Sequence, residues 1–301
     1  MTPVVVGIDI GGTKTHILLA DAVTHTVTED VTLPSTDWQT RDLHRAADWL
    51  IARLSAIAGD AEFVRVAVGA HGCETTAQCA LLAGAMRTAL GGIPVTVVND
   101  AELLVPAAGF AHGIGVVAGT GSIAVGRHRD TGVRLSAGGW GWVLGDEGSG
   151  SALVREAARA LLTHADTGTD LSADPLAKAL LSSYGAADLP ALAAAMSWDG
   201  GVETWGRHTH AVFNAADEGS ALARDVIAQG GHALADLVIR LAERGARTDT
   251  VVLAGGVITG RPRLWTAVTD RLADALPGTA PHLLTAPPAR GALNLALNGG
   301  H

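Results

Sequence analysis

The segment from Gly138 to Gly150 carries the side-chain types that bind sugars. It reads GGWGWVLGDEGSG and holds six glycines, two tryptophans and two acids in thirteen residues. Glycine packs poorly in a core and suits places where the backbone approaches another group closely or takes a positive φ. Asp146 and Glu147 offer acceptors to hydroxyl groups, and Trp140 and Trp142 offer flat apolar faces. The segment predicts a ligand loop; the alternative is an acid-capped turn ahead of the helix that starts near Ser149.

A second glycine loop lies near the start of the chain, where VVVGIDIGGTKTHILLA predicts a strand, a tight turn and a strand. Gly7 and Gly12 nearly match a Walker A loop, but Thr13 stands where that motif needs lysine, and a strand follows in place of a helix. The P-loop interpretation therefore fails. We expect the amides of Gly11, Gly12, Thr13 and Lys14 to bind phosphate oxygens and Asp9 to hold a cation through water. A hairpin turn without a ligand is the alternative.

Two further glycine loops follow strand-like runs. VVAGTGS ends in Gly119-Thr120-Gly121-Ser122, where small residues let amides and hydroxyls reach an anion. VVLAGGVITG precedes the last long helix, and an adenosine could lie against Gly255 and Gly256. Each loop alone is also consistent with an ordinary turn. Four such loops at the ends of four strands favour one nucleotide and substrate site.

The elements that must position these loops alternate between strand and helix, which predicts an α/β fold. We expect two similar lobes, 1–105 and 106–288, with a C-terminal helix at 289–301 packing on the first. Ligands of such sheets bind beyond the carboxyl ends of the strands, so we expect the glycine loops to share an interlobe cleft. The expected strands are 3–9, 15–20, 25–33, 63–69, 94–98, 113–119, 122–128, 133–136, 250–256 and 282–285; the expected helices include 40–58, 74–90 and 261–276.

Composition excludes several classes of protein. The formal net charge is −9 over 301 residues, and no Lys/Arg run is present, which argues against nucleic-acid binding. No signal-peptide pattern and no apolar span of about 18 residues or more occurs, so we expect a soluble cytoplasmic protein without membrane contact. Cys73 and Cys79 are the only cysteines, and their spacing fits neither a disulfide framework nor a zinc site. We expect both to be buried thiols.

Taken together, the motifs resemble the N-acetylglucosamine kinase and BadF/BadG-type ATPase family, within the actin-like, ribonuclease H-like sugar kinase fold. DIGGTKT resembles the first phosphate motif, VVNDA the segment with the catalytic aspartate, AGTGS the second phosphate motif and LAGGV the adenosine motif. GGWGWVLGDEGSG resembles the sugar-binding segment and is the most family-specific of the five. The resemblance covers nearly the whole chain.

The resemblance implies ATP and Mg²⁺ as cofactors, an amino sugar as substrate and a possible homodimer. It makes Asp100 the general base, Thr13 and Thr120 phosphate contacts and Asp9 the holder of hydrated magnesium. Helix capping is the alternative for Asp100. The implied substrate contacts are Asp37, Asn99, Asp100, Gly121, Ser122, Gly139, Trp140, Asp146 and Glu147; the implied nucleotide contacts are Gly11, Gly12, Thr13, Lys14, Thr120, Gly121, Gly255, Gly256 and Thr259.

Asp37 bears on which amino sugar is accepted. It stands in LPSTDWQTRD, where acetylated-sugar kinases of the family carry an STN-type sequence with asparagine. A carboxylate would favour an ammonium over a neutral acetamide, so we expect glucosamine, with N-acetylglucosamine as the alternative. Asp37 could instead cap the helix expected near Thr40 or contact a ring hydroxyl. His71 in GAHGC either contacts sugar or packs.

Other classes of protein fit less well. A sugar-responsive repressor would need a helix-turn-helix ahead of Pro3, and an activase of the radical dehydratase type would need cluster-binding cysteines after AGTGS. A chaperone or filament would have no use for GGWGWVLGDEGSG. His208 and His210 resemble a metal pair but lack a nearby Cys or second His cluster, so we expect ordinary polar roles for them.

Overall fold

The computed structural model describes residues 2–59, 61–198 and 202–299. The chain divides into two compact units, Met1–Gly115 with Leu284–His301 and Val116–Leu283. The boundaries predicted from the sequence lay between residues 105 and 106 and between residues 288 and 289. The idea that the units act as two lobes of one enzyme stays a prediction.

The first unit is built on a five-stranded sheet of order β3-β2-β1-β4-β5. β1 pairs antiparallel with β2 and parallel with β4, and β4 pairs parallel with β5. Its strands are β1 (Pro3–Ile10), β2 (Lys14–Asp21), β3 (Val27–Pro34), β4 (Glu62–Ala70) and β5 (Val95–Val98). The parallel strands β1, β4 and β5 end at the same edge, so the residues that follow them gather there.

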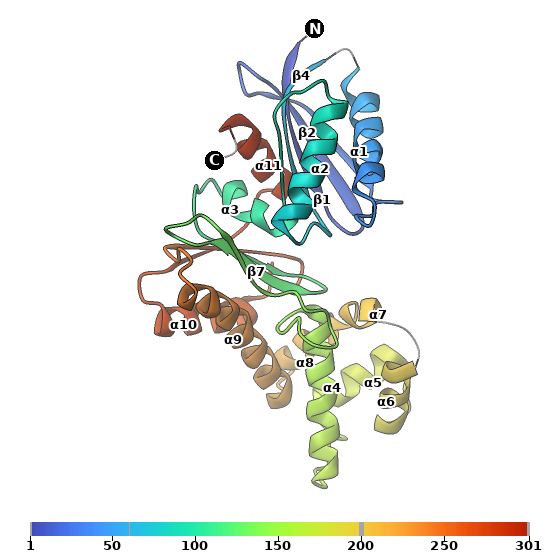
Figure 1. The fold of residues 1–301 in the computed structure, drawn as a ribbon. Coiled ribbons are helices and arrows are strands. Elements are labelled where there is room, and N and C mark those ends of the chain that lie inside the picture. Colours follow the sequence, from blue (N-terminus) through green and yellow to red (C-terminus); the bar gives the residue numbers. More distant parts are fainter. Residues whose placement is uncertain (1, 60, 199–201, 300–301) are drawn as a thin grey trace. The chain divides into compact units, whose positions relative to one another are not determined.

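Helices cover both faces of this sheet, which explains why β1 is apolar almost throughout. Successive residues of a strand point to opposite faces. Val4, Val6 and Ile8 therefore pack with α1 (Leu43–Ala58) and α2 (Thr76–Ala89), whereas Val5 packs with α11 (Pro288–Leu297). Figure 1 shows α1 and α2 on one side of the sheet and α11 on the other.

The second unit contains a sheet of order β10-β9-β6-β7-β8 and most of the helices (Figure 1). β7 and β8 form an antiparallel hairpin, and β9 pairs parallel with β10. The strands are β6 (Ile114–Ala118), β7 (Ser122–Arg127), β8 (Arg134–Gly138), β9 (Thr250–Ala254) and β10 (Ala280–Leu283). The helices are α4 (Gly150–Asp166), α5 (Pro175–Tyr184), α6 (Leu189–Trp198), α7 (Val202–Gly206), α8 (Thr209–Asp217), α9 (Ala221–Glu243) and α10 (Pro262–Ala275). The predicted α/β class is confirmed.

The structure shows how three helices begin, which decides between alternatives that the sequence left open. α1 begins at Leu43, and its cap is Asp42, which accepts hydrogen bonds from two first-turn amides, so Asp37 is not a cap. α4 is capped by the side chain of Ser149, so the acids before it are not needed for capping. The helix expected after Asp100 is a 3-10 turn, η1 (Asp100–Leu103), followed by the short α3 (Leu104–Ala107). Pro106 has no N–H to donate to the carbonyl of residue 102, which prevents a continuous α-helix there.

Candidate active site

Asp100 lies directly after β5, and the capping alternative for it is wrong. Asn99 is the cap of η1, with its side chain accepting a hydrogen bond from the Ala101 amide. The Asn99 Nδ2 also lies 3.3 Å from both the Cys73 carbonyl and a Glu74 carboxylate oxygen. Asp100 Oδ1 accepts from the Ala101 amide at 3.0 Å. Asn99 thus fixes the strand end, and the Asp100 carboxylate is presented beside it.

Asp9 is the second carboxylate at this sheet edge. It pairs with Gly69 of β4 and with His16 of β2 in the strand register. Burial raises the pKa of Asp9 to about 7, and the negative charge of Asp100 acts in the same direction. His16 and Lys14 lower it by smaller amounts. A partly buried carboxylate whose ionised form is disfavoured by burial and by a neighbouring carboxylate is a place where a cation would be stabilising.

The turn between β1 and β2 exposes Gly12, Thr13 and Lys14 next to this pair. The Gly11 amide donates to the Lys14 carbonyl at 3.0 Å, so it serves the turn and is not available to a phosphate. The Thr13 carbonyl accepts a hydrogen bond from the Ser35 amide at 3.0 Å, and this bond holds Thr13 in place. The prediction of anion binding at this turn therefore concerns Gly12, Thr13 and Lys14.

His71 is the functional candidate that the sequence left undecided. Its Nδ1 lies 3.5 Å from Asp100 Oδ2. A hydrogen bond to Asp100 raises the pKa of His71 above the usual 6.5, against a smaller opposing effect of burial. The signal in the sequence was its place directly after β4, because β4 and β5 are parallel and end side by side.

In the second unit, the structure joins the AGTGS turn to the acidic loop. The Ser122 amide donates to Asp146 Oδ1 at 3.4 Å, and the Ser122 hydroxyl donates to the Glu147 carbonyl at 2.8 Å. The Gly150 amide donates to the Gly119 carbonyl at 2.9 Å. Burial raises the pKa of Asp146, and its backbone has a positive φ of 57°. This strained, partly buried carboxylate beside a glycine turn suits a ligand contact.

The tryptophans of the acidic loop have different environments. Trp140 is 75% exposed, next to the exposed Gly139. Trp142 packs edge-on against Trp205 with ring centroids 5.0 Å apart, and its carbonyl accepts a hydrogen bond from Arg155. Trp140 is therefore the indole of this loop that can offer a face to a ligand.

The LAGGV motif meets the same turn. Gly255 has a φ of 118°, and a Cβ placed there would overlap the backbone of Ala118 and Gly119. The Val257 amide donates to the Ala118 carbonyl at 3.1 Å, and the Thr259 amide to the Gly255 carbonyl at 3.1 Å. Gly255 thus permits a backbone approach that no other residue allows, next to the turn that carries Thr120. Gly256 and Thr259 are exposed beside it.

Asp37 follows β3, which β2, β1 and β4 separate from β5 in the order of the sheet. It stands on an exposed turn with a φ of 67°. It lines a cavity of about 720 Å³ with Trp38, Gln39, Arg45, Ala46, Asp48 and Trp49. The contact between Trp38 and Trp49, whose ring centroids are 5.4 Å apart, was not predicted from the sequence. The Trp38 Nε1 donates to the His71 carbonyl at 3.0 Å, which ties this segment to the end of β4.

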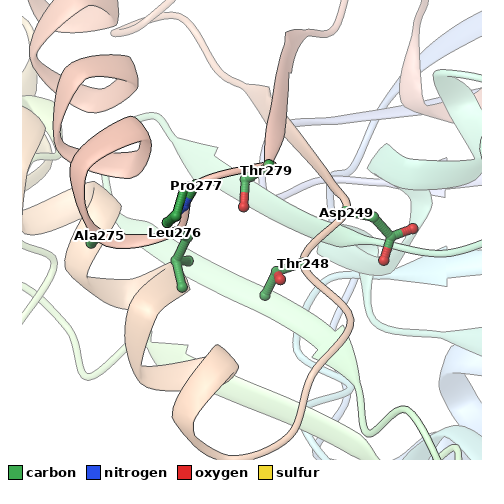
Figure 2. A pocket seen from close by; sticks show the side chains of 7 residues that line it. Thr248, Asp249, Ala275, Leu276, Pro277 and Thr279 are labelled. Carbon is green, nitrogen blue, oxygen red and sulfur yellow. The ribbon is translucent and has the colours of Figure 1, made fainter.

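A second cavity, of about 380 Å³, contains none of the predicted site residues. It is lined by Thr248, Asp249, Ala275, Leu276, Pro277, Gly278 and Thr279, which precede β9 and β10. The glycine turn at Gly255 follows β9, so this cavity belongs to the opposite end of that strand. Figure 2 shows the Asp249 carboxylate turned away from Leu276 and Pro277. Among the described residues of this lining, Asp249 has no second charged group beside it to share a ligand.

The remaining predicted features have ordinary roles. Cys73 and Cys79 are buried thiols, as expected. His208 shares a hydrogen bond with the Ser183 hydroxyl at 2.6 Å and stacks on Tyr184. Within residues 2–59, 61–198 and 202–299, no group of three or more His, Cys, Asp and Glu side chains could hold a metal by itself. No helix in these ranges is long and apolar enough to cross a membrane.

Comparison with known proteins extends over nearly the whole chain. The N-acetyl-D-glucosamine kinase of Dictyostelium discoideum is 26% identical over 318 residues, 97% of each protein. The N-acetylmuramic acid/N-acetylglucosamine kinase of Clostridium acetobutylicum is 33% identical over 169 residues, which is 54% of this chain and about half (54%) of that protein.

Solved structures show the same fold. The structure of a candidate N-acetylglucosamine kinase from Chromobacterium violaceum has a TM-score of 0.71 at 24% identity, covering 97% of this chain and 98% of its own. A ROK family glucokinase from Streptomyces griseus, solved with glucose and AMPPNP, has a TM-score of 0.57 at 18% identity over 97% of this chain and 98% of its own. Residues 6–296 match the BadF/BadG/BcrA/BcrD ATPase family, and the chain belongs to that family.

Proposed function

We propose that this protein is an ATP-dependent kinase that phosphorylates the 6-hydroxyl of an N-acetylated amino sugar, with N-acetylglucosamine as the first candidate. The observation that carries the proposal is the Asp100 carboxylate, presented at the end of β5 beside the partly buried Asp9 and the exposed Gly12–Lys14 turn. Phosphoryl transfer needs one positioned base, anion-binding amides and charge neutralisation, and this sheet edge offers all three.

In this mechanism Asp100 accepts the proton of the sugar hydroxyl. The hydroxyl oxygen forms a bond to the γ-phosphorus of ATP while the bond from that phosphorus to the bridging oxygen of ADP breaks. Gly12, Thr13 and Lys14 would contact phosphate oxygens, and the family resemblance gives Thr120 and Gly121 the same role. Asp146 and Trp140 would bind the sugar through its hydroxyls and its apolar face.

The residues present fit a divalent cation held through water. Asp9 is a partly buried carboxylate whose ionised form is disfavoured first by burial and then by Asp100, and a bound cation would offset that cost. Magnesium commonly takes one or two carboxylates, several waters and substrate phosphates. When bound, it would neutralise charge on the transferring phosphate.

The acetylated sugar is favoured over glucosamine by two observations. Both of the similar kinases from Dictyostelium and Clostridium carry N-acetylglucosamine in their names. The argument for glucosamine depended on a costly buried carboxylate at position 37, but Asp37 is exposed. An exposed carboxylate is well hydrated and discriminates weakly between an ammonium and an acetamide.

The test is a parallel kinase assay with N-acetylglucosamine, glucosamine, N-acetylmuramic acid and glucose, each with ATP and Mg²⁺. We expect the highest kcat/KM for N-acetylglucosamine. Asp100→Asn should lower kcat by about 10²- to 10⁴-fold while sugar affinity stays within about tenfold, because the base acts on the transition state. Glu29→Gln on the exposed face of β3 is the matched control. Preference for glucosamine would reinstate Asp37 as a specificity residue, and full turnover by Asp100→Asn would refute the assignment of the base.

A further inference from the structure

His71 occupies a defined place among the groups proposed for catalysis. Its backbone amide donates to the Ile10 carbonyl at 2.9 Å, and its carbonyl accepts from the Trp38 indole at 3.0 Å. These two bonds hold the residue at the end of β4 in one position. The side chain is 56% exposed and keeps access to a bound substrate.

The imidazole ring lies next to two parts of the site in the same unit. Nδ1 is 3.5 Å from Asp100 Oδ2. The opposite edge of the ring faces the phosphate turn, because a Cβ built on Gly12 would lie 3.8 Å from both Cδ2 and Nε2. The ring therefore spans the distance from the proposed base to the turn that would hold phosphate.

We propose that His71 is a positioning residue for phosphoryl transfer, which donates Nδ1–H to Asp100 Oδ2 and thereby fixes the carboxylate relative to the Gly12 turn. The inference rests on the proposed kinase function. Asp100 Oδ1 is held by the Ala101 amide, so with His71 on Oδ2 both oxygens have a fixed direction and each keeps a lone pair for the sugar hydroxyl.

The electrostatics agree with this donor role. The largest influence on the pKa of His71 is its hydrogen bond to Asp100, which raises it, and Glu74 adds to the rise. The carboxylates that face the imidazole are Asp100, on η1, and Glu74, on the same loop as His71. The β1–β2 turn faces it with the Gly12 backbone, and the segment before α1 contributes the Trp38 indole. The positive charge of a protonated His71, beside the carboxylates of Asp100 and Glu74, also offsets part of the repulsion that an incoming polyphosphate would meet.

The kinetic test compares His71→Ala, His71→Asn and His71→Gln with wild type. Loss of the contact should lower kcat by about 10- to 100-fold in His71→Ala, as expected for a misplaced base, while KM for sugar and ATP changes less than about threefold. The asparagine amide can occupy the place of Nδ1, so His71→Asn should recover most of kcat. Glutamine reaches the place of Nε2 and should not. His112→Asn, at an exposed position, is the matched control.

Two outcomes would overturn the inference in an active enzyme: His71→Ala with kcat within twofold of wild type, or rescue by glutamine and not by asparagine. An NMR titration of the His71 ring tests the contact without turnover. We expect a pKa above 6.5 in wild type and a downward shift in Asp100→Asn, with His112 unchanged. An unshifted His71 would refute the contact, whereas a wild-type protein that phosphorylates no sugar would refute the proposed function instead.

Discussion

At the scale of single residues, raised pKa values distinguish Asp9 and Asp146 from surface acids. The pKa of Asp9 is raised from 3.8 to about 7, first by burial and then by the charge of Asp100. The pKa of Asp146 is also raised, chiefly by burial. Carboxyl groups with raised pKa values at partly buried positions are candidates for functional sites because stability alone does not favour them.

Asp9 should couple metal binding to pH. Magnesium requires the ionised form, so below about pH 7 the apparent Mg²⁺ affinity in the kinase assay should fall by up to about tenfold per pH unit. In the metal-free protein, the effect of rising pH on folding stability has the opposite sign. Because the folded-state pKa lies above 3.8, the contribution of Asp9 to stability is fully present below about pH 4 and is lost as pH rises through about 7.

Thermal unfolding of the metal-free protein from pH 4 to pH 8 measures this effect. Asp9→Asn should flatten the decline in stability and remove the pH dependence of Mg²⁺ activation. Glu29→Gln, which replaces an exposed acid on β3, should leave both unchanged. A metal-free pH profile that is the same in Asp9→Asn and wild type would contradict the prediction.

Asp146 should control sugar affinity through its charge. Asp146→Asn keeps the shape of the side chain but removes charged hydrogen bonds to hydroxyls, which are worth about 1.5–3 kcal/mol each, so sugar KM should rise by about 10- to 150-fold. In wild type the same KM should rise as pH falls through the raised pKa of Asp146, because the protonated acid is a poorer acceptor. Steady-state kinetics check both; Asp130→Asn, on the exposed β7–β8 turn, is the control.

At the scale of elements, the glycine turns join neighbouring strand ends. Gly255 lets the end of β9 approach the end of β6 at Ala118, and the Gly150 amide joins the start of α4 to Gly119. The AGTGS and LAGGV motifs of the second unit are thus parts of one packed cluster. A residue that separates two of these backbones should affect both stability and nucleotide binding.

Gly255→Ala tests the close approach of the two strand ends. The added Cβ would overlap the Ala118 backbone and would stand at a φ of 118°, so we expect a loss of unfolding free energy of at least about 1–3 kcal/mol. Gly256→Ala is a close control for stability, since a Cβ added at that position would meet open space. Urea unfolding of both variants measures the difference, and equal stabilities would contradict the close approach.

At the scale of the whole molecule, the two ends of the chain complete one unit. α11 packs on the sheet face opposite α1 and α2, with Ala289, Leu293 and Ala296 against Val5 and Ala67. Gly7 lies so close to Leu293 that any side chain there would overlap it. The last helix, which follows the whole second unit along the chain, is therefore part of the core of the first unit.

Leu293→Ala should destabilise the first unit. It is fully buried, so its truncation should cost about 2–5 kcal/mol of unfolding free energy through lost burial and a residual cavity. Arg290→Ala, on the exposed side of the same helix, should cost less than about 0.5 kcal/mol. Chemical unfolding followed by far-UV circular dichroism checks both, and similar losses in the two variants would show that α11 does not hold the sheet.

The sequence by itself determined the α/β class and the glycine turns after the strands. These depend on local properties: side-chain periodicity in VVVGIDI and the backbone freedom of paired glycines. The tertiary structure decided which side chains meet. His71 reaches Asp100, Ser122 reaches Asp146, and Asn99 rather than Asp100 caps η1. The contacts of His71 and Ser122 join separate segments, and their geometry is set by strand register and helix packing, which no local pattern encodes. The Asn99 cap is local, but Asn and Asp are about equally good caps, so the residue types did not say which of the two neighbours would take that place.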